Sequence, residues 1–426
     1  MINSLMLTRL AGGEVRGSCL LPSRRENDTE PEPPGSIARG RWAPQLPSRG
    51  GTMTKRQTAR AKPARAAKPF MPPYAPSWVD RLTAFVDRLP GPAWFFYLIT
   101  ALGLSLALSS IQWSEGAYAI GTFNASHIYT AFVTVYCLAL IHFLDRAADS
   151  AMASFAPLLT PAAQSAQPDD QDHSDFPLLR YKLTTLPPRP TLLATVAGGA
   201  FASIAYAIDV ARGNPQPYLT GTAGTPLSTA SFMTVFIAGN AVVFLLAYHT
   251  IHQLTLVSRI YSRHARINIY QLQPLYSLSR PSALTAIGLI LFVYGLFLIS
   301  PQEVATDPIQ LGLTLAFAGI AVATFALPLY GAHRRLVAAK EACRAEVAFR
   351  FEGATLQLHR ELDLGRLTQM DQLNRALASL EIEENALRRI PTWPWQPGSV
   401  RAVAAALLLP VAVWVIQAVL GRLLSI

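Results

Sequence analysis

Cysteine is scarce in this chain, and the few cysteines present form no recognisable site. Cys19, Cys137 and Cys343 lie far apart, so they give neither a metal-ligand spacing nor an evident disulfide framework. The sequence also lacks a glycine-rich phosphate loop, a nucleophile elbow, an HExxH zinc motif and the kinase motif set. It therefore indicates no catalytic residues, no metal ligands and no cofactor.

Charged side chains are scarce as well. They make up 15% of the chain and hydrophobic residues make up 51%, whereas soluble domains have about 25% charged residues. Seven apolar runs come close to the 20 or so helical residues that cross a hydrocarbon core. These runs are 93–111, 128–144, 191–208, 230–249, 283–300, 309–331 and 402–421. The composition predicts an all-α, polytopic membrane protein with about seven transmembrane helices.

Ionisable residues are almost absent inside the seven runs. Their polar positions are mainly Tyr136, Asn240 and Tyr294. Ion-coupled transporters place charged or histidine side chains near the membrane midplane, where they are costly and therefore functional. This absence counts against such a transporter, and we interpret Asn240 as an interhelical hydrogen-bonding residue.

The third run is rich in small residues. Ala194, Gly198 and Ala202 recur at steps of four, which allows a second helix to approach closely. We expect this run to form the central, most buried helix.

Basic residues are distributed asymmetrically around the runs. With the N-terminus inside, the cytoplasmic segments hold 34 of the 36 Lys and Arg residues, and only Arg212 and Arg422 fall elsewhere. Under the positive-inside rule this predicts a cytoplasmic (inner) membrane protein with its C-terminus outside.

Residues 1–76 contain 11 of the 32 prolines and no sustained apolar period. Such a segment cannot bury enough surface to fold, so we predict a disordered cytoplasmic tail. Its basic stretch after Met53 favours contact with anionic lipid headgroups, and a nucleic-acid partner is the less favoured alternative.

Residues 77–90 have the pattern of a short amphipathic helix. Ser77 and Asp80 have the spacing of a capping box, and Trp78 begins an apolar face. We expect this helix to lie at the membrane interface, with Trp78 as an anchor, before the six-span bundle predicted for 91–332.

Between the sixth and seventh runs lies a charged segment, 333–392. It contains two series of apolar residues, each spaced so that it forms a stripe along one face of a helix. Gly365 interrupts the pattern, so the two stripes predict a coiled-coil-like hairpin facing the cytoplasm. We expect its arms to pack through Val347, Leu358, Leu373, Leu377 and Leu380.

Four histidines fall at the inner ends of the even-numbered runs: His142, His249, His252 and His333. Imidazoles at one depth can bind a metal or haem. Their spacing matches no known ligand pattern, and interfacial histidines are common beside charged residues. They are weak candidates for a cofactor site.

The hairpin ends in a proline-rich turn containing Trp393 and Trp395, which begins the last segment, 393–426. Tryptophans near a membrane commonly anchor at the interface. This RIPTWPW motif (389–395), LPGPAW (89–94) and LPLYGAHRRL (327–336) resemble those of uncharacterised bacterial multi-pass membrane proteins. The resemblance implies a helical fold in a bacterial inner membrane and brings no activity or site residues.

These features favour a non-enzymatic signalling, scaffold or assembly protein acting through its cytoplasmic hairpin. The hairpin is expected to bind a cytoplasmic protein or a second copy of the chain. A transporter or channel, and a membrane-embedded enzyme or cofactor carrier, are the alternatives.

Overall fold

The computed structural model describes residues 70–158, 175–211, 225–264, 269, 272–299, 308–366 and 370–423. The chain divides into two units, residues 1–71 and 72–426, and the description below concerns the second. The predicted tail, with its basic stretch and lipid contact, lies outside the described residues except at its end. There, the Tyr74 hydroxyl donates to the carbonyl of Thr185, and the Tyr181 hydroxyl donates to the carbonyl of Tyr74.

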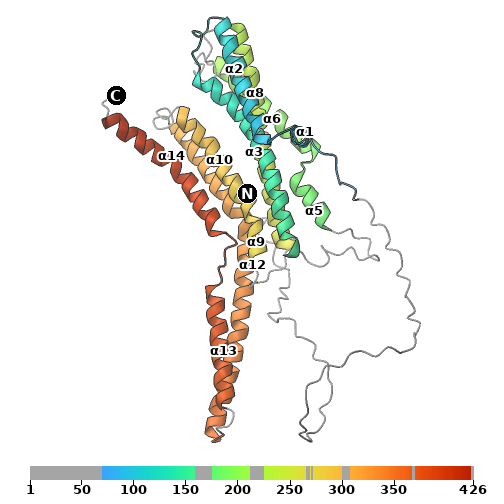
Figure 1. The fold of residues 1–426 in the computed structure, drawn as a ribbon, viewed down its shortest axis with the longest axis vertical. Coiled ribbons are helices and arrows are strands. Elements are labelled where there is room, and N and C mark those ends of the chain that lie inside the picture. The colour runs from blue at the N-terminus through green and yellow to red at the C-terminus, as the bar shows by residue number, and fades with distance from the viewer. Residues whose placement is uncertain are drawn as a thin grey trace, which may run out of the picture. The chain divides into compact units, whose positions relative to one another are not determined.

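The described residues contain helices and no strands, in agreement with the predicted all-α class (Figure 1). The helices are α1 (Trp78–Val86), α2 (Ala93–Ser114), α3 (Ala125–Phe155), α5 (Asp175–Thr184), α6 (Pro188–Ala211), α8 (Pro226–Arg259), α9 (Gln273–Ser277), α10 (Ser279–Ile299), α12 (Pro308–Asp363), α13 (Met370–Arg389) and α14 (Pro397–Leu423). A 3₁₀ turn follows α3 and a π-helical turn, Ile260–His264, extends α8.

Five helices are long and apolar enough to cross a membrane: α2, α3, α6, α8 and α10. They correspond to the first five predicted runs and indicate a membrane protein. The sixth run lies within α12. The seventh lies within α14, where Gly398–Leu409 forms a shorter apolar stretch among the described residues. These two spans remain predictions.

Helices α3 and α8 lie side by side and form the centre of the packing. Their buried side chains meet in one hydrophobic cluster that includes Cys137, Ile141, Leu144 and Leu245. Val79 of α1 joins the same cluster, so the short first helix is attached to the bundle. The Cys137 side chain is fully buried in this cluster.

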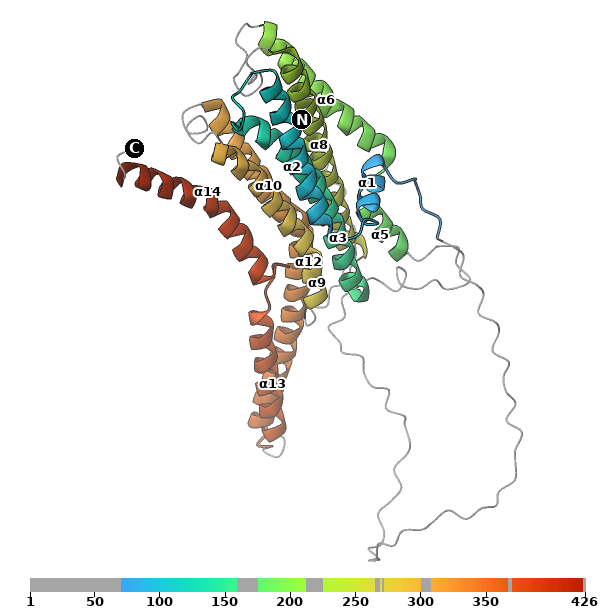
Figure 2. The same cartoon turned by 45° about the horizontal axis from the view of Figure 1, so that its top comes forward.

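The prediction that the third run forms the central helix is wrong. Helix α6 packs on α8 at the edge of the bundle (Figure 2). Many of its large side chains, including Leu193 and Phe201, are exposed. The close approach itself is confirmed, because a Cβ on Gly198 would lie 2.5 Å from the carbonyl oxygen of Asn240. Small residues reveal a close contact on one side of a helix and carry no information about the other sides.

Helix α12 continues without interruption from the sixth predicted run into the charged segment. Its 56 residues make a helix about 84 Å long at a rise of about 1.5 Å per residue. The boundary expected between bundle and hairpin, at 332–333, therefore lies inside one helix.

Helix α13 folds back along the second half of α12, as the interrupted stripe predicted (Figures 1 and 2). Gly365 has φ +68°, a backbone conformation that glycine adopts without strain, immediately after α12 ends. We call residues 333–390, the end of α12 together with α13, the arm. From the arm the chain enters α14, which packs on α10 through Val403, Ala283 and Ala286.

Candidate functional site

The four candidate histidines occupy two separate places. His142 on α3 is almost completely buried and lies between two polar partners. Its Nδ1 is 3.1 Å from the hydroxyl of Tyr97, and its Nε2 is 2.9 Å from a carboxylate oxygen of Asp87. Arg146, one turn further along α3, binds the same carboxylate. The turn between α1 and α2 supplies Asp87, so this cluster joins three helices.

His249 and His252, on α8, belong to the same end of the bundle. His249 Nε2 lies 2.8 Å from a carboxylate oxygen of Asp145 on α3. His252 Nε2 donates to the backbone carbonyl of Lys182 at 3.1 Å. Each ring thus holds a neighbouring helix, α3 in one case and α5 in the other.

Asp80 connects the amphipathic helix to the same region. One of its carboxylate oxygens accepts from the backbone and hydroxyl of Ser77, both at 2.8 Å, and from the backbone N–H of Leu186 at 3.1 Å. The predicted capping box is present, and Leu186, just before α6, is a partner that local sequence does not reveal. Burial raises the pKa of the Asp80 carboxyl, although the hydrogen bonds from Ser77 act in the opposite direction.

His333 lies apart from the other three histidines, at the base of the arm. Its ring stacks on Trp393 at 3.9 Å between centroids, and its Nδ1 donates to the carbonyl of Thr392 at 3.0 Å. Trp393 stacks on Trp395 at 4.4 Å, and Trp395 stacks on Phe325 at 5.1 Å. We call these four rings the aromatic joint, because they connect α12 to the turn that leads from α13 to α14.

The four candidate histidines all make contacts with other parts of the protein. Among the described residues, no group of three or more His, Cys, Asp or Glu side chains is placed to hold a metal ion. Three of the candidates hold helix-to-helix contacts and the fourth stacks in the aromatic joint.

The tryptophans predicted as interface anchors have specific contacts. Trp78 is 37% exposed, and its indole N–H donates to the hydroxyl of Thr195 on α6 at 3.2 Å. Trp393 and Trp395 belong to the aromatic joint. All three therefore connect segments of the chain to one another.

The residues expected to pack between the two helices of the arm differ in burial. Val347 and Leu373 are buried, and Leu358, Leu377 and Leu380 are half-buried. Glu384 of α13 pairs with Arg388 one turn along the same helix and lies 3.8 Å from Arg344 on α12. Arg344 and Glu384 thus form an ion pair between the two helices.

The base of the hairpin is fixed by a lysine. The Lys340 ammonium donates to the carbonyls of Arg388 and Ile390, at 3.0 and 2.8 Å. These are carbonyls of the last turn of α13 and the residue after it, where a cation is favourable.

The outer face of the arm exposes large apolar side chains that the sequence stripes did not single out. Phe349 is 76% exposed, Leu356 is 64% exposed and Ile382 is 71% exposed. Phe349 and Leu356 are seven residues apart, so they lie on one face of α12, turned away from Val347. This seven-residue spacing could have indicated a second apolar face from sequence alone. The sequence interpretation instead followed the longer series of apolar residues that includes Val347 and Leu358.

At the opposite end of the bundle, Glu115 lies against the beginning of α8. Its carboxylate accepts from the backbone N–H groups of Leu227 at 3.2 Å and Ser228 at 2.6 Å. Desolvation acts to raise the pKa of Glu115, but these hydrogen bonds, with one from Thr225, outweigh it and lower the pKa. No sequence motif predicted this contact, because its partners are more than a hundred residues away.

Comparisons of the chain with protein-family models, curated proteins and solved structures found no match.

Proposed function

We propose that this chain is a non-enzymatic assembly or signalling protein of a bacterial cytoplasmic membrane, acting through its arm. In this proposal the first half of α12 is the sixth span, and α14 is the seventh span. The N-terminus and the arm face the cytoplasm, and the C-terminus lies outside. The 34 basic residues on the predicted inner side support this orientation.

The observation that carries the proposal is the continuity of α12. A helix that begins at Pro308 and ends at Asp363 joins a predicted span directly to the arm, with no linker between them. The aromatic joint and Lys340 attach the end of α13 to α12 near the start of the arm. A displacement of α12 in the membrane would therefore move the arm as a rigid unit, as a signalling or scaffold element requires.

The partner that we propose for the arm is a second copy of the chain. The arm, residues 333–390, contains ten Lys or Arg and nine Asp or Glu, so it is nearly neutral although the chain carries +10. A surface with both signs and a few exposed apolar side chains complements itself about a two-fold axis, whereas nucleic acid or anionic lipid requires a basic surface. Two hairpins pairing through Phe349 and Leu356 would form a four-helix bundle.

The proposal is tested by the mass of the full-length protein in nanodiscs large enough for two copies. Light scattering should give a dimer for the wild type. Leu356→Glu and Phe349→Glu should give monomers, because each places a carboxylate in the apolar contact.

Gln357→Glu is the matched control, since Gln357 is exposed and adjacent to Leu356, and the change adds the same charge. This variant should remain a dimer. A monomeric wild type, or equal behaviour of Leu356→Glu and Gln357→Glu, would exclude self-association through this face.

A further inference from the structure

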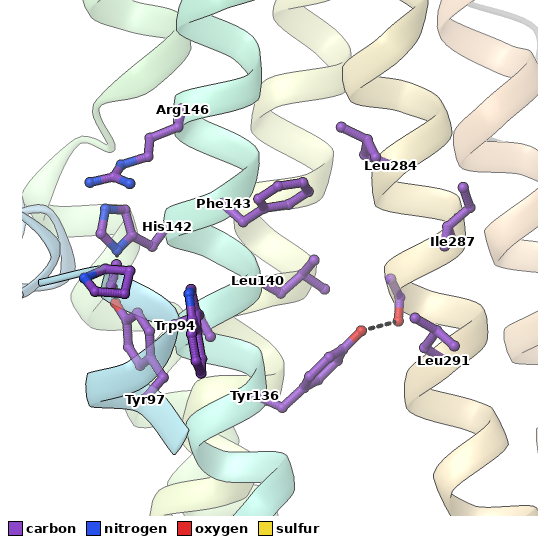
Figure 3. Close-up of a pocket in the computed structure, with 14 residues that line it drawn as sticks. Trp94, Tyr97, Tyr136, Leu140, His142, Phe143, Arg146, Leu284, Ile287 and Leu291 are labelled. Carbon is purple, nitrogen blue, oxygen red and sulfur yellow. Dashed lines mark hydrogen bonds between the residues drawn. The ribbon is translucent and has the colours of Figure 1, made fainter. Parts of the chain in front are cut away.

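A cavity of about 490 Å³ lies between α2, α3 and α10. Its size falls within the range of about 300–1,000 Å³ that is usual for ligand sites. Figure 3 shows Phe143, Leu140 and Tyr136 of α3 on one side, facing Leu284, Ile287 and Leu291 of α10. Most of this wall is hydrocarbon, so the cavity suits an apolar chain.

The cavity lies on the outer surface of the bundle. Among the side chains that line it, Trp94 is 65% exposed, Phe143 is 52% exposed and Leu291 is 42% exposed. In a membrane, exposed apolar side chains on spanning helices face lipid. A lipid chain therefore has direct access to the cavity.

One end of the cavity is polar. His142 and Arg146 line it, and Tyr97 lies beside His142 (Figure 3). Arg146 contacts Asp87, and the side chains of both residues remain well exposed, at 57% and 41%. A cation and an anion thus stand next to each other where the apolar wall ends.

This pairing selects a headgroup with both charges. A guanidinium has five N–H donors, so Arg146 can contact a phosphate while it binds Asp87. The Asp87 carboxylate has further lone pairs to accept from a primary ammonium. A trimethylated ammonium has no N–H to donate, and a headgroup without a cation leaves Asp87 facing an anion.

We propose that this cavity binds one phospholipid with a phosphoethanolamine headgroup. An acyl chain lies along Leu291 and Phe143, the phosphate contacts Arg146, and the ammonium contacts Asp87. The inference requires that α2, α3 and α10 lie in a membrane. It is independent of the arm and of its pairing.

The test compares two lipids with identical oleoyl chains on the full-length protein in detergent. Native mass spectrometry counts the bound lipid during titration with dioleoyl phosphatidylethanolamine or dioleoyl phosphatidylcholine. The wild type should bind one phosphatidylethanolamine about tenfold more tightly, as expected for one charge-assisted hydrogen bond. Equal affinity for the two lipids would overturn the proposal.

Three variants separate the contacts. Asp87→Asn should remove the preference between the two lipids, because the amide gives no charge for the ammonium. Arg146→Gln should weaken both lipids, since both carry the phosphate. Leu291→Trp should weaken both by filling the cavity, and unchanged binding in this variant would show that the lipid lies elsewhere.

Asp149→Asn is the matched control. Asp149 is also on α3 and pairs with an arginine, but that arginine, Arg180, does not line the cavity, whereas Arg146, the partner of Asp87, does. This variant should keep the tenfold preference. A loss of the preference as large as that in Asp87→Asn would assign the effect to the general charge at this end of the bundle and would contradict the proposed site.

Discussion

Asp80 shows how one side chain connects a local motif to the tertiary structure. Its spacing from Ser77 predicted a capping box, and the structure has both hydrogen bonds of that motif. The same carboxylate also accepts from Leu186, which attaches α1 to the beginning of α6. One residue thus caps a helix and fixes its position.

The raised pKa of Asp80 predicts a pH dependence of stability. Burial disfavours the charged form, so the folded-state pKa lies above the unfolded value of about 3.9. The protonated form therefore adds to the free energy of unfolding. This contribution is complete below about pH 3.9 and is lost as the pH rises through the folded-state pKa.

Melting curves of the wild type and Asp80→Asn check this prediction. The asparagine does not titrate, so the difference in melting temperature should shift in favour of the wild type as the pH falls from 7 toward 4. A shift in favour of the variant would mean that the hydrogen bonds from Ser77 outweigh burial.

Residues whose partners lie far away in sequence were not predictable. His142, His249 and His252 were identified by their depth, but their partners Asp87, Asp145 and Lys182 come from other helices. Only the packing of α1, α3, α5 and α8 brings them together. Capping at Ser77 and the turn at Gly365 were predictable because both depend on neighbouring residues alone.

At the scale of helices, the contact between α6 and α8 depends on a single glycine. A Cβ on Gly198 would lie 2.5 Å from Asn240 O and 2.8 Å from Phe244 Cβ, so the helices would have to separate. Gly198→Ala should lower the melting temperature, by an overpacking cost of about 1–3 kcal/mol.

The neighbouring glycine gives the matched control for this contact. A Cβ on Gly199 would meet Ile237 at 3.6 Å, an ordinary van der Waals distance. Gly199→Ala should therefore melt like the wild type. Similar losses in both variants would indicate a general effect of glycine replacement in α6.

The seam of the arm can be tested at Leu373. This side chain is 9% exposed and faces α12, so Leu373→Asp loses roughly 1.5–3 kcal/mol of burial and places a carboxylate in an apolar contact. Hydrogen exchange on the full chain should show loss of protection in α13 and in the facing part of α12. Protection in α3 and α8 should not change.

Asn374→Asp adds the same charge at the adjacent, exposed position and should leave the arm protected. If Leu373→Asp kept full protection from hydrogen exchange, α12 and α13 would be held together by the aromatic joint and Lys340 alone.

At the scale of the whole molecule, the hydrophobic runs of the sequence predicted several of the long helices. The first five runs correspond to helices of spanning length. Such a run can be recognised from consecutive residues alone, without knowledge of tertiary contacts. The prediction of α6 as the central helix failed, since run composition does not determine lateral position. The continuity of α12 through 332–333 was also not predicted, because a change from apolar to charged composition looks like a domain boundary.

The orientation of the chain is the central claim of this account, since an arm on the outer side could not act as a cytoplasmic docking element. The most direct measurement of this orientation is a set of topology reporters fused to the chain at chosen positions. Cytoplasmic reporters should be active after Asp175, Ser262 and Gly365, and periplasmic reporters after Gly213 and Gln302. The decisive position is Gly365, at the tip of the arm. A reporter that is active there in the cytoplasm supports the account, and one that is active there only in the periplasm contradicts it.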